Sequence, residues 1–211
     1  MAALCPLIPP KRLFSRAEVL QIPSPVPKAN GLYAWYFRNV PSVIPTDNCL
    51  EFKGNRLLYI GIAPDKINKP NSRATLVKRI RQHYAGNAEG STLRRTLGVL
   101  LAEQSGFPLR RVGSGKRFTL THAGEQFLDD WMEKNAFVAW MEHPEPWTIE
   151  HTLLLELSCP LNIADNAHHL FCSTLKKMRT EALCRAREMP IANEHNQKRL
   201  SKLMPVCETA G

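Results

Sequence analysis

The sequence predicts an α+β protein with a small, mainly antiparallel sheet of three strands. Two segments, GLYAWYF (31–37) and RLLYIGIA (56–63), are short and rich in aromatic and β-branched residues, which is typical of strands. A third such segment, AFVAWME (136–142), follows a long stretch with helical periodicity. At 211 residues and 44% hydrophobic content, the chain can form one core with extensions.

The chain divides into three predicted parts. Residues 1–28 contain six prolines and should form an irregular lead-in, with at most a short helix near 15–20. Residues 29–166 should form the main domain, and 167–211 a basic helical extension.

Two enlargements interrupt the main domain. The segment 38–55 is a long loop between the first two strands. The segment of about 91–135 is predicted to be a helix capped by Ser91, a strand–turn–strand around Gly-Ser-Gly, and a second helix. This helix-hairpin-helix insertion could grip a nucleic acid or could be a structural brace.

Polar side chains at special positions indicate where a site lies. In the second strand, alternation puts Tyr59 on the face opposite Leu58, Ile60 and Ile62, whereas the first strand has aromatic residues on both faces. The next helix has an apolar stripe, and Arg79 and His83 lie along its border; the stripe consists of Leu76, Val77, Ile80 and Tyr84.

A carboxylate in the helix that begins near Pro146 is the clearest physical signal. Glu150 projects into the middle of that helix's apolar face, formed by Ile149, Leu153, Leu154 and Leu157. Burial of an unpaired carboxylate costs several kcal/mol, so Glu150 should have a cation, a metal or a raised pKa. The alternative is that the helix start meets solvent and Glu150 only favours the helix dipole.

Charge favours a polyanionic partner. The net charge is +9, and ten basic and two acidic residues between Arg73 and Arg117 give that stretch a local charge of +8. A solvated surface that keeps the protein in solution is the alternative. The residues predicted to contact nucleic acid are Arg73, Lys78, Arg81, Arg94, Arg95, Arg110, Arg111, Lys116 and Arg117.

The six cysteines form no C-x-x-C pair, which argues against a zinc site or a disulfide framework. No apolar run reaches the length of a membrane span, and the N-terminal segment lacks the features of a signal peptide. We therefore expect a cytoplasmic protein that does not bind membranes.

The motifs occur in the order found in one known family. Gly31-Leu32-Tyr33, Tyr59-Ile60-Gly61, Arg79 with His83, and Glu150 followed by Asn162 together resemble the GIY-YIG nuclease family, and the pattern is similar to that of its restriction enzymes. Leu32 replaces the usual isoleucine.

The resemblance implies a fold, an activity and a set of roles. The fold is a three-stranded sheet flanked by helices, and the activity is hydrolysis of DNA phosphodiester bonds by an endonuclease that uses one Mg²⁺ or Mn²⁺ and no small-molecule cofactor. The implied roles are Tyr33 as base toward water, His83 as its proton acceptor, Tyr59 as a positioning hydroxyl, Arg79 as phosphate clamp, Glu150 as metal ligand and Asn162 as a hydrogen bonder that shapes the site.

Two other functions remain open from the sequence. A binding module could keep the fold and the basic stretch without catalysis, or the basic tail helix could make the chain an interaction protein. Duplex or branched DNA is the expected partner, and both sequence-specific restriction and structure-selective repair remain open.

Overall fold

A computed structural model of the protein describes residues 7–67 and 71–194. The strands are β1 (Gly31–Phe37), β2 (Glu51–Phe52), β3 (Asn55–Ala63), β4 (Arg110–Val112), β5 (Arg117–Thr119) and β6 (Ala136–Glu142). The helices are α1 (Arg16–Leu20), α2 (Leu76–Ala85), α3 (Thr92–Leu100), α4 (Ala102–Ser105), α5 (His122–Asn135), α6 (Trp147–Glu156) and α7 (Leu170–Glu188). None of these described helices is long and apolar enough to cross a membrane.

The three predicted strands form the central sheet. Its order is β2-β3-β1-β6, and β1 pairs antiparallel with both β3 and β6. The enlarged loop 38–55 contributes the two-residue strand β2, which extends the sheet beyond β3. The predicted α+β class is confirmed, with one short strand more than expected.

A bulge in β3 changes which side chains share a face. Trp35 pairs with Tyr59 but Tyr36 pairs with Leu57, so Leu58 is the extra residue of the bulge. Leu58 therefore packs in the same core cluster as Tyr59, and its predicted grouping with the aliphatic face is wrong. Strict alternation predicted the opposite because a bulge shifts every residue on one side of it by one position.

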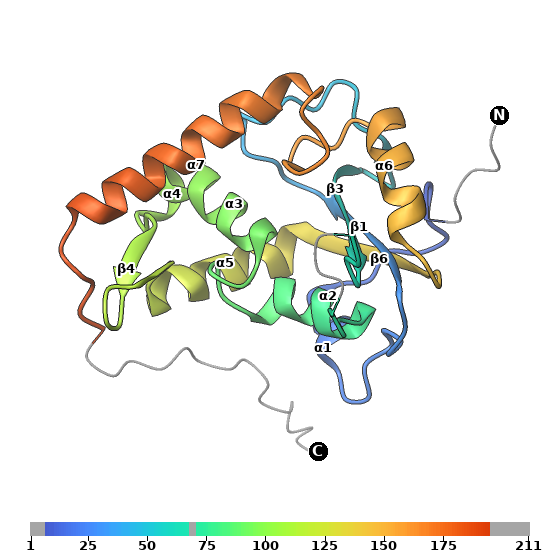
Figure 1. Ribbon diagram of the computed structural model, residues 1–211, viewed down its shortest axis with the longest axis horizontal. Helices are drawn as coiled ribbons and strands as arrows, with labels where there is room; N and C mark the ends of the chain where they lie inside the picture. Colours follow the sequence, from blue (N-terminus) through green and yellow to red (C-terminus); the bar gives the residue numbers. More distant parts are fainter. Residues whose placement is uncertain (1–6, 68–70, 195–211) are drawn as a thin grey trace, which may run out of the picture.

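Helices cover both faces of the sheet (Figure 1). One face, with Leu32 and Ile60, packs against Leu154 of α6. The other face packs against α1, α2, α3 and α5 and the start of α7. The sheet is therefore the middle of three layers, and each of its two faces has its own hydrophobic core.

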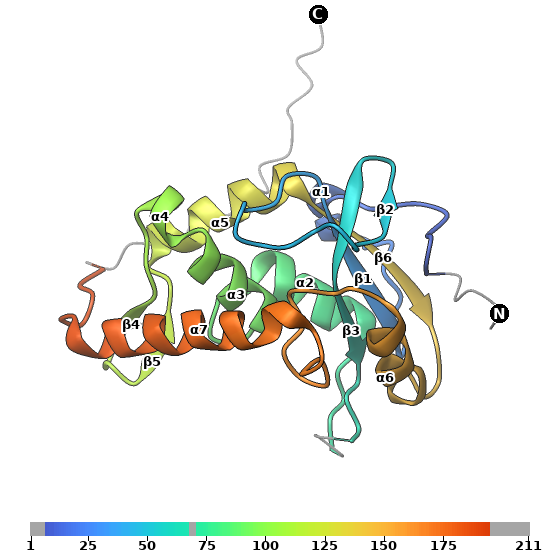
Figure 2. The same cartoon turned by 90° about the horizontal axis from the view of Figure 1, so that it is seen from above.

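The insertion forms the end of the molecule away from the sheet. Strands β4 and β5 make a separate two-stranded sheet. Figures 1 and 2 show α7 running from the sheet to this hairpin, and Ala192, just after α7, donates its N–H to the Arg111 carbonyl at 2.8 Å. The C-terminal helix thus connects the two ends of the molecule.

A buried arginine joins three helices. Arg94 of α3 is fully buried, and its Nη2 and Nη1 donate to Glu125 Oε2 and Asp129 Oδ1 of α5 at 2.6 and 2.9 Å. Nη1 also donates to the carbonyl oxygens of His83 and Tyr84 at the end of α2. The predicted contact between Arg94 and nucleic acid is wrong, because this side chain does not reach the surface.

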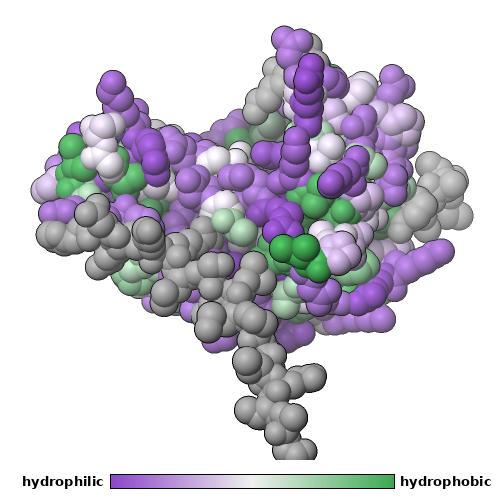
Figure 3. Space-filling view, turned by 90° about the horizontal axis from the view of Figure 1, so that it is seen from below, coloured by the Kyte–Doolittle hydropathy of each residue, from purple (hydrophilic) through white to green (hydrophobic). Residues whose placement is uncertain are grey.

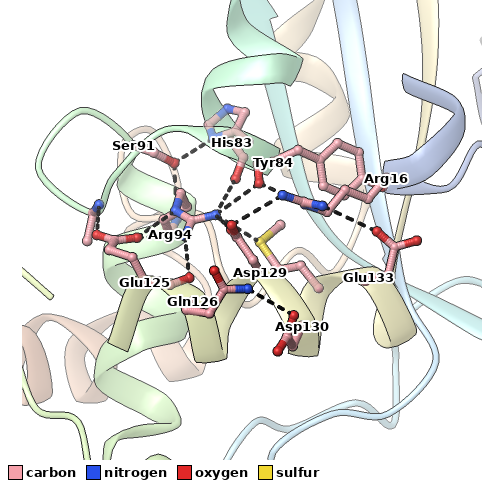
Figure 4. Close-up of polar contacts among 12 residues, drawn as sticks. Arg16, His83, Tyr84, Ser91, Arg94, Glu125, Gln126, Asp129, Asp130 and Glu133 are labelled. Atoms are coloured by element: carbon pink, nitrogen blue, oxygen red, sulfur yellow. Dashed lines mark hydrogen bonds and ion pairs between the residues drawn. The ribbon is translucent and has the colours of Figure 1, made fainter. Parts of the chain in front are cut away.

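Further bonds extend this network, and Figure 4 shows those between Arg16, Arg94, Glu125 and Asp129 among them. Glu125 Oε1 accepts from Thr119 Oγ1 of β5 at 2.8 Å, and Asp129 Oδ2 pairs with Arg16 of α1 at 3.2 Å. A buried cation is tolerated only when anions and hydrogen-bond acceptors surround it, and here two carboxylates and three carbonyl groups do so. Residues of α1, α2, α3, β5 and α5 therefore meet at one charged centre.

Replacement of this arginine should destabilise the fold strongly. Arg94→Met leaves the buried Glu125 without its cation and Asp129 with Arg16 alone, and we expect the free energy of unfolding to fall by about 3–5 kcal/mol. Denaturation by urea, followed by circular dichroism, measures this. The matched control is Arg56→Met, because Arg56 is exposed and contacts Glu51 only at 3.9 Å; equal losses in the two variants would contradict the prediction.

Candidate active site

Both motif tyrosines lie on the sheet face that packs against α2. Tyr33 pairs with Gly61 across the β1–β3 ladder, and Tyr59 lies two positions along β3. Both belong to the same core cluster as Ile80 of α2, so their hydroxyl groups point toward this helix side. Tyr33 is 1% exposed and Tyr59 8% exposed.

Close packing explains the two motif glycines. A Cβ atom on Gly61 would lie 2.6 Å from both Cζ and Oη of Tyr33, because the tyrosine ring lies directly over this residue. A Cβ atom on Gly31 would lie 2.1 Å from the Met141 carbonyl oxygen of β6 and 2.8 Å from Leu76 Cδ1 of α2. The absence of side chains here lets Tyr33 and α2 approach the sheet.

A chain of hydrogen bonds leads away from Tyr33. Its hydroxyl lies 2.9 Å from Nε2 of His83, and His83 Nδ1 lies 2.8 Å from Oγ of Ser91. Ser91 is the N-cap of α3, where its Oγ also accepts from the Arg94 N–H. When Nδ1 carries the proton and donates it to Ser91, the Nε2 lone pair can accept from Tyr33.

The electrostatic environment keeps both groups neutral. Burial, followed by the charges of Arg79 and Arg94, lowers the pKa of His83 well below its usual value. Burial raises the pKa of Tyr33 and of Tyr59, while the charge of Arg79 acts in the opposite direction on each. A neutral histidine beside a protonated phenol is the arrangement that permits proton transfer from oxygen to nitrogen.

Arg79 lies close to both tyrosines. It projects from α2, is half-buried, hydrogen-bonds to Tyr33 and interacts electrostatically with Tyr59. These interactions raise its pKa, so it carries a positive charge at all physiological pH values. Its border position on α2, as the sequence predicts, lets the guanidinium reach the site.

Glu150 of α6 approaches the site as a half-buried carboxylate. Burial, then the charges of Asp65 and Asp165, raises its pKa to about 7. Among the described residues it forms no ion pair with a basic side chain. The raised pKa is one of the three outcomes that the apolar helix face predicts for this residue.

A hard divalent cation fits this carboxylate. Mg²⁺ is typically held by one or two carboxylates, with water and phosphate oxygens completing the shell. Within the described residues, no group of three or more His, Cys, Asp or Glu side chains could hold a metal ion. Glu150 suits a metal that takes most of its ligands from water and substrate, and not one that needs a protein cage.

Asn162 supports the site from the edge of β3. Its Oδ1 accepts from the Ile60 N–H at 2.9 Å and its Nδ2 donates to the Ile60 carbonyl at 2.8 Å, while Leu161 N–H bonds to the Leu58 carbonyl at 3.0 Å. The side chain therefore replaces a neighbouring strand at Ile60, next to Tyr59. Both polar atoms of the side chain thus help to hold the strand.

Several of the other predicted basic residues are held by groups of the protein. Arg95 donates to the carbonyls of Ala88 and Glu89, and Arg117 pairs with Glu89 at 3.1 Å. The hairpin residues Arg110 and Arg111 donate to carbonyl oxygens just after α7. Apart from Arg94, their contacts with nucleic acid stay predictions.

Two neighbours of the site carry no signal in the sequence. The sequence indicates only a helix cap at Ser91, although this residue also forms a hydrogen bond with His83. The sequence shows Arg179 only as one of several basic residues of a helix, although it interacts electrostatically with Tyr59. Both come from parts of the chain that the motifs do not cover, so only the fold brings them near the tyrosines.

The comparison with known families agrees with this geometry. A model of the GIY-YIG catalytic domain matches residues 31–181, from the start of β1 into α7. The chain belongs to the GIY-YIG family. This family consists of nucleases, so membership implies nuclease activity and a nucleic-acid substrate. Neither the curated proteins nor the solved structures gave a match to the chain.

Close packing of Tyr33 on Gly61 predicts the effect of one methyl group. Gly61→Ala should displace the phenol from His83, and we expect nuclease turnover to fall about 100-fold, as for other small misplacements of catalytic groups. The control is Gly98→Ala, where the new Cβ would lie 3.0 Å from Leu120 and its three nearest neighbouring atoms all belong to Leu120. Equal turnover in the two variants, measured with equal amounts of folded protein, would contradict this role of Gly61.

The raised pKa of Glu150 predicts a pH-dependent stability. In the folded protein without metal, Glu150 holds its proton to a higher pH than in the unfolded chain, so its contribution to stability is complete below about pH 4.5 and is lost as the pH rises through about 7. At pH 8 and in EDTA, Glu150→Gln should raise the free energy of unfolding by about 1–3 kcal/mol, and by much less at pH 5.

Urea denaturation at both pH values measures the difference. Glu156→Gln, on the exposed side of the same helix, is the control and should show no such pH dependence. A Glu150→Gln variant that is no more stable than wild type at pH 8 would show that the carboxylate is not buried as described.

Proposed function

We propose that the protein is a magnesium-dependent endonuclease that hydrolyses DNA phosphodiester bonds with water activated by a tyrosine. The observation that carries the proposal is the hydrogen bond between the Tyr33 hydroxyl and a fully buried His83 at 2.9 Å. The hydroxyl satisfies the buried Nε2 atom, and the same contact is the one that proton transfer from oxygen to nitrogen requires.

The proton path follows from this contact. The attacking water gives its proton to the Tyr33 oxygen while the Tyr33 proton moves to Nε2 of His83, and the water oxygen forms its bond to phosphorus as the bond to the leaving oxygen breaks. His83 becomes an imidazolium whose Nδ1–H donates to Ser91. The low pKa of His83 makes this proton easy to return at the end of the cycle.

Arg79, Tyr59 and Glu150 act on the phosphate. Arg79 would hold the non-bridging oxygens, since a guanidinium presents several donors in a plane and stays charged. The Tyr59 hydroxyl would orient the water or the phosphate. Glu150 would hold Mg²⁺ or Mn²⁺, which when bound supplies positive charge to neutralise the leaving oxygen.

DNA cleavage assays test the proposal. Supercoiled plasmid, a four-way junction and single-stranded DNA, each with Mg²⁺, Mn²⁺ or EDTA, should reveal metal-dependent cuts in at least one substrate. Glu150→Ala should lower the rate at least about 1000-fold, because a catalytic metal contributes several kcal/mol. His83→Gln should lower it about 100-fold or more through loss of the proton acceptor.

Glu156→Ala is the matched control, since this carboxylate lies on the exposed side of α6. Cleavage that survives Glu150→Ala, or no cleavage of any substrate with either metal, would overturn the proposal. Salt-sensitive binding without any cleavage would instead favour a nucleic-acid-binding protein that keeps the fold. Discrete plasmid fragments would indicate restriction, and selective cutting of the junction would indicate repair.

A further inference from the structure

Arg179 is a half-buried cation without an acidic partner. It projects from the middle of α7 toward α3, where its Nη1 donates to the buried Thr96 hydroxyl at 3.3 Å. Among the described residues it forms no ion pair. One bond to a neutral hydroxyl leaves most of the donors of this guanidinium free for another ligand.

The packing of α7 places Arg179 near the active site. Leu175, one turn before Arg179 on α7, is buried in the same core cluster as Tyr59. In agreement with this, burial and then the positive charge of Arg95 lower the pKa of Arg179, and Tyr59 acts in the opposite direction. Arg95 is anchored by bonds to the Ala88 and Glu89 carbonyls, which fix its position beside α7. Two arginines therefore lie together near the site tyrosine.

Such a pair is costly in the free protein. Partial burial of a guanidinium removes water, and a like charge nearby adds repulsion. Arg94 shows how this chain satisfies a structural arginine, with Glu125 and Asp129 within 2.9 Å. Arg179 has no such compensation, which is the pattern expected when the missing anion belongs to a ligand.

The shape of the molecule fits an extended anion. Figure 2 shows the turn after β3 and the β4–β5 hairpin projecting to the same side, with α7 running between them. Seen from below, two mainly hydrophilic projections stand at the upper edge, and the surface between them is hollowed (Figure 3). Arg187 lies about two turns after Arg179 on α7. Its Cζ atom is 5.7 Å from the centre of the Phe118 ring of β5.

We propose that Arg179, supported by Arg95, binds a phosphate group of the nucleic acid next to the one that is cleaved. This rests on the proposed function, because it assigns Arg79 to the scissile phosphate and Arg179 to its neighbour on the same strand. A guanidinium contacts two phosphate oxygens at once, so the pair would fix the register of the strand in the site. Substrate binding then offsets the cost that the free protein carries.

Binding measurements on the full chain test Arg179 apart from cleavage. Glu150→Gln serves as the non-cleaving reference, and its affinity for a fluorescent 24-base-pair duplex is measured by anisotropy over a range of salt concentrations. Adding Arg179→Met, which keeps an apolar stem, should weaken binding about tenfold and reduce the slope of log Kd against log salt by about one, the value for one lost phosphate contact. Arg179→Lys should restore part of both.

The same variants distinguish a brace between helices from a phosphate ligand. Arg179→Met should leave the melting temperature unchanged or raise it, because it removes an unpaired cation, whereas a brace would lower it by several degrees. Arg185→Met is the control, since Arg185 is exposed on α7 and contacts Glu181 at 3.8 Å. Loss of stability without a change in salt slope, or an affinity equal to that of Arg185→Met, would overturn the inference.

Failure of the two proposals can be told apart. If wild-type protein cuts DNA and Arg179→Met changes neither affinity nor slope, only the phosphate subsite is wrong. If wild type does not cut but Arg179 governs salt-dependent binding, only the catalytic proposal is wrong. A reference protein that binds none of duplex, four-way-junction and single-stranded DNA overturns both.

Discussion

The buried charge of Arg94 is the interaction on which the rest of the structure depends. It ties α5 to the end of α2 through two carboxylates and the His83 and Tyr84 carbonyls. The N–H of the same residue donates to the Ser91 cap of α3, and its charge is one cause of the low pKa of His83. Stability and proton chemistry are thus coupled, because the group that holds the helices together also keeps the proton acceptor neutral.

Local patterns predicted the parts of the site that lie within one element. Glu150 was predicted from an apolar helix face, and its raised pKa follows from the burial that this face implies. Tyr59 was placed off the aliphatic face, which is correct. Leu58 was misplaced because nothing local marks the bulge, which arises from pairing between β1 and β3. The periodicity of a segment can be taken from its own residues, whereas the register of a strand depends on the strand with which it pairs.

The arginines show why a count of charges in the sequence does not identify the residues that bind a ligand. Arg94, Arg95 and Arg179 read alike in the sequence, yet one is paired and buried, one is anchored to carbonyls, and one is half-buried without an anion. The cost of a cation depends on burial and on the sign of its neighbours, and both are set by contacts between α3, α5 and α7. A local charge of +8 therefore indicates a polyanion but not which residues meet it.

The free site is in an electrostatic state that a substrate and a cation together would relieve. Glu150 tends to keep a proton because burial and two aspartates oppose its ionisation, and Arg179 carries an unpaired charge near Tyr59. Each is unfavourable alone. A divalent cation would favour the carboxylate form of Glu150, and a phosphate would neutralise the arginines, so binding of either is aided by the groups already in place. The protein gives up stability in the free state so that little reorganisation is needed when the phosphodiester arrives.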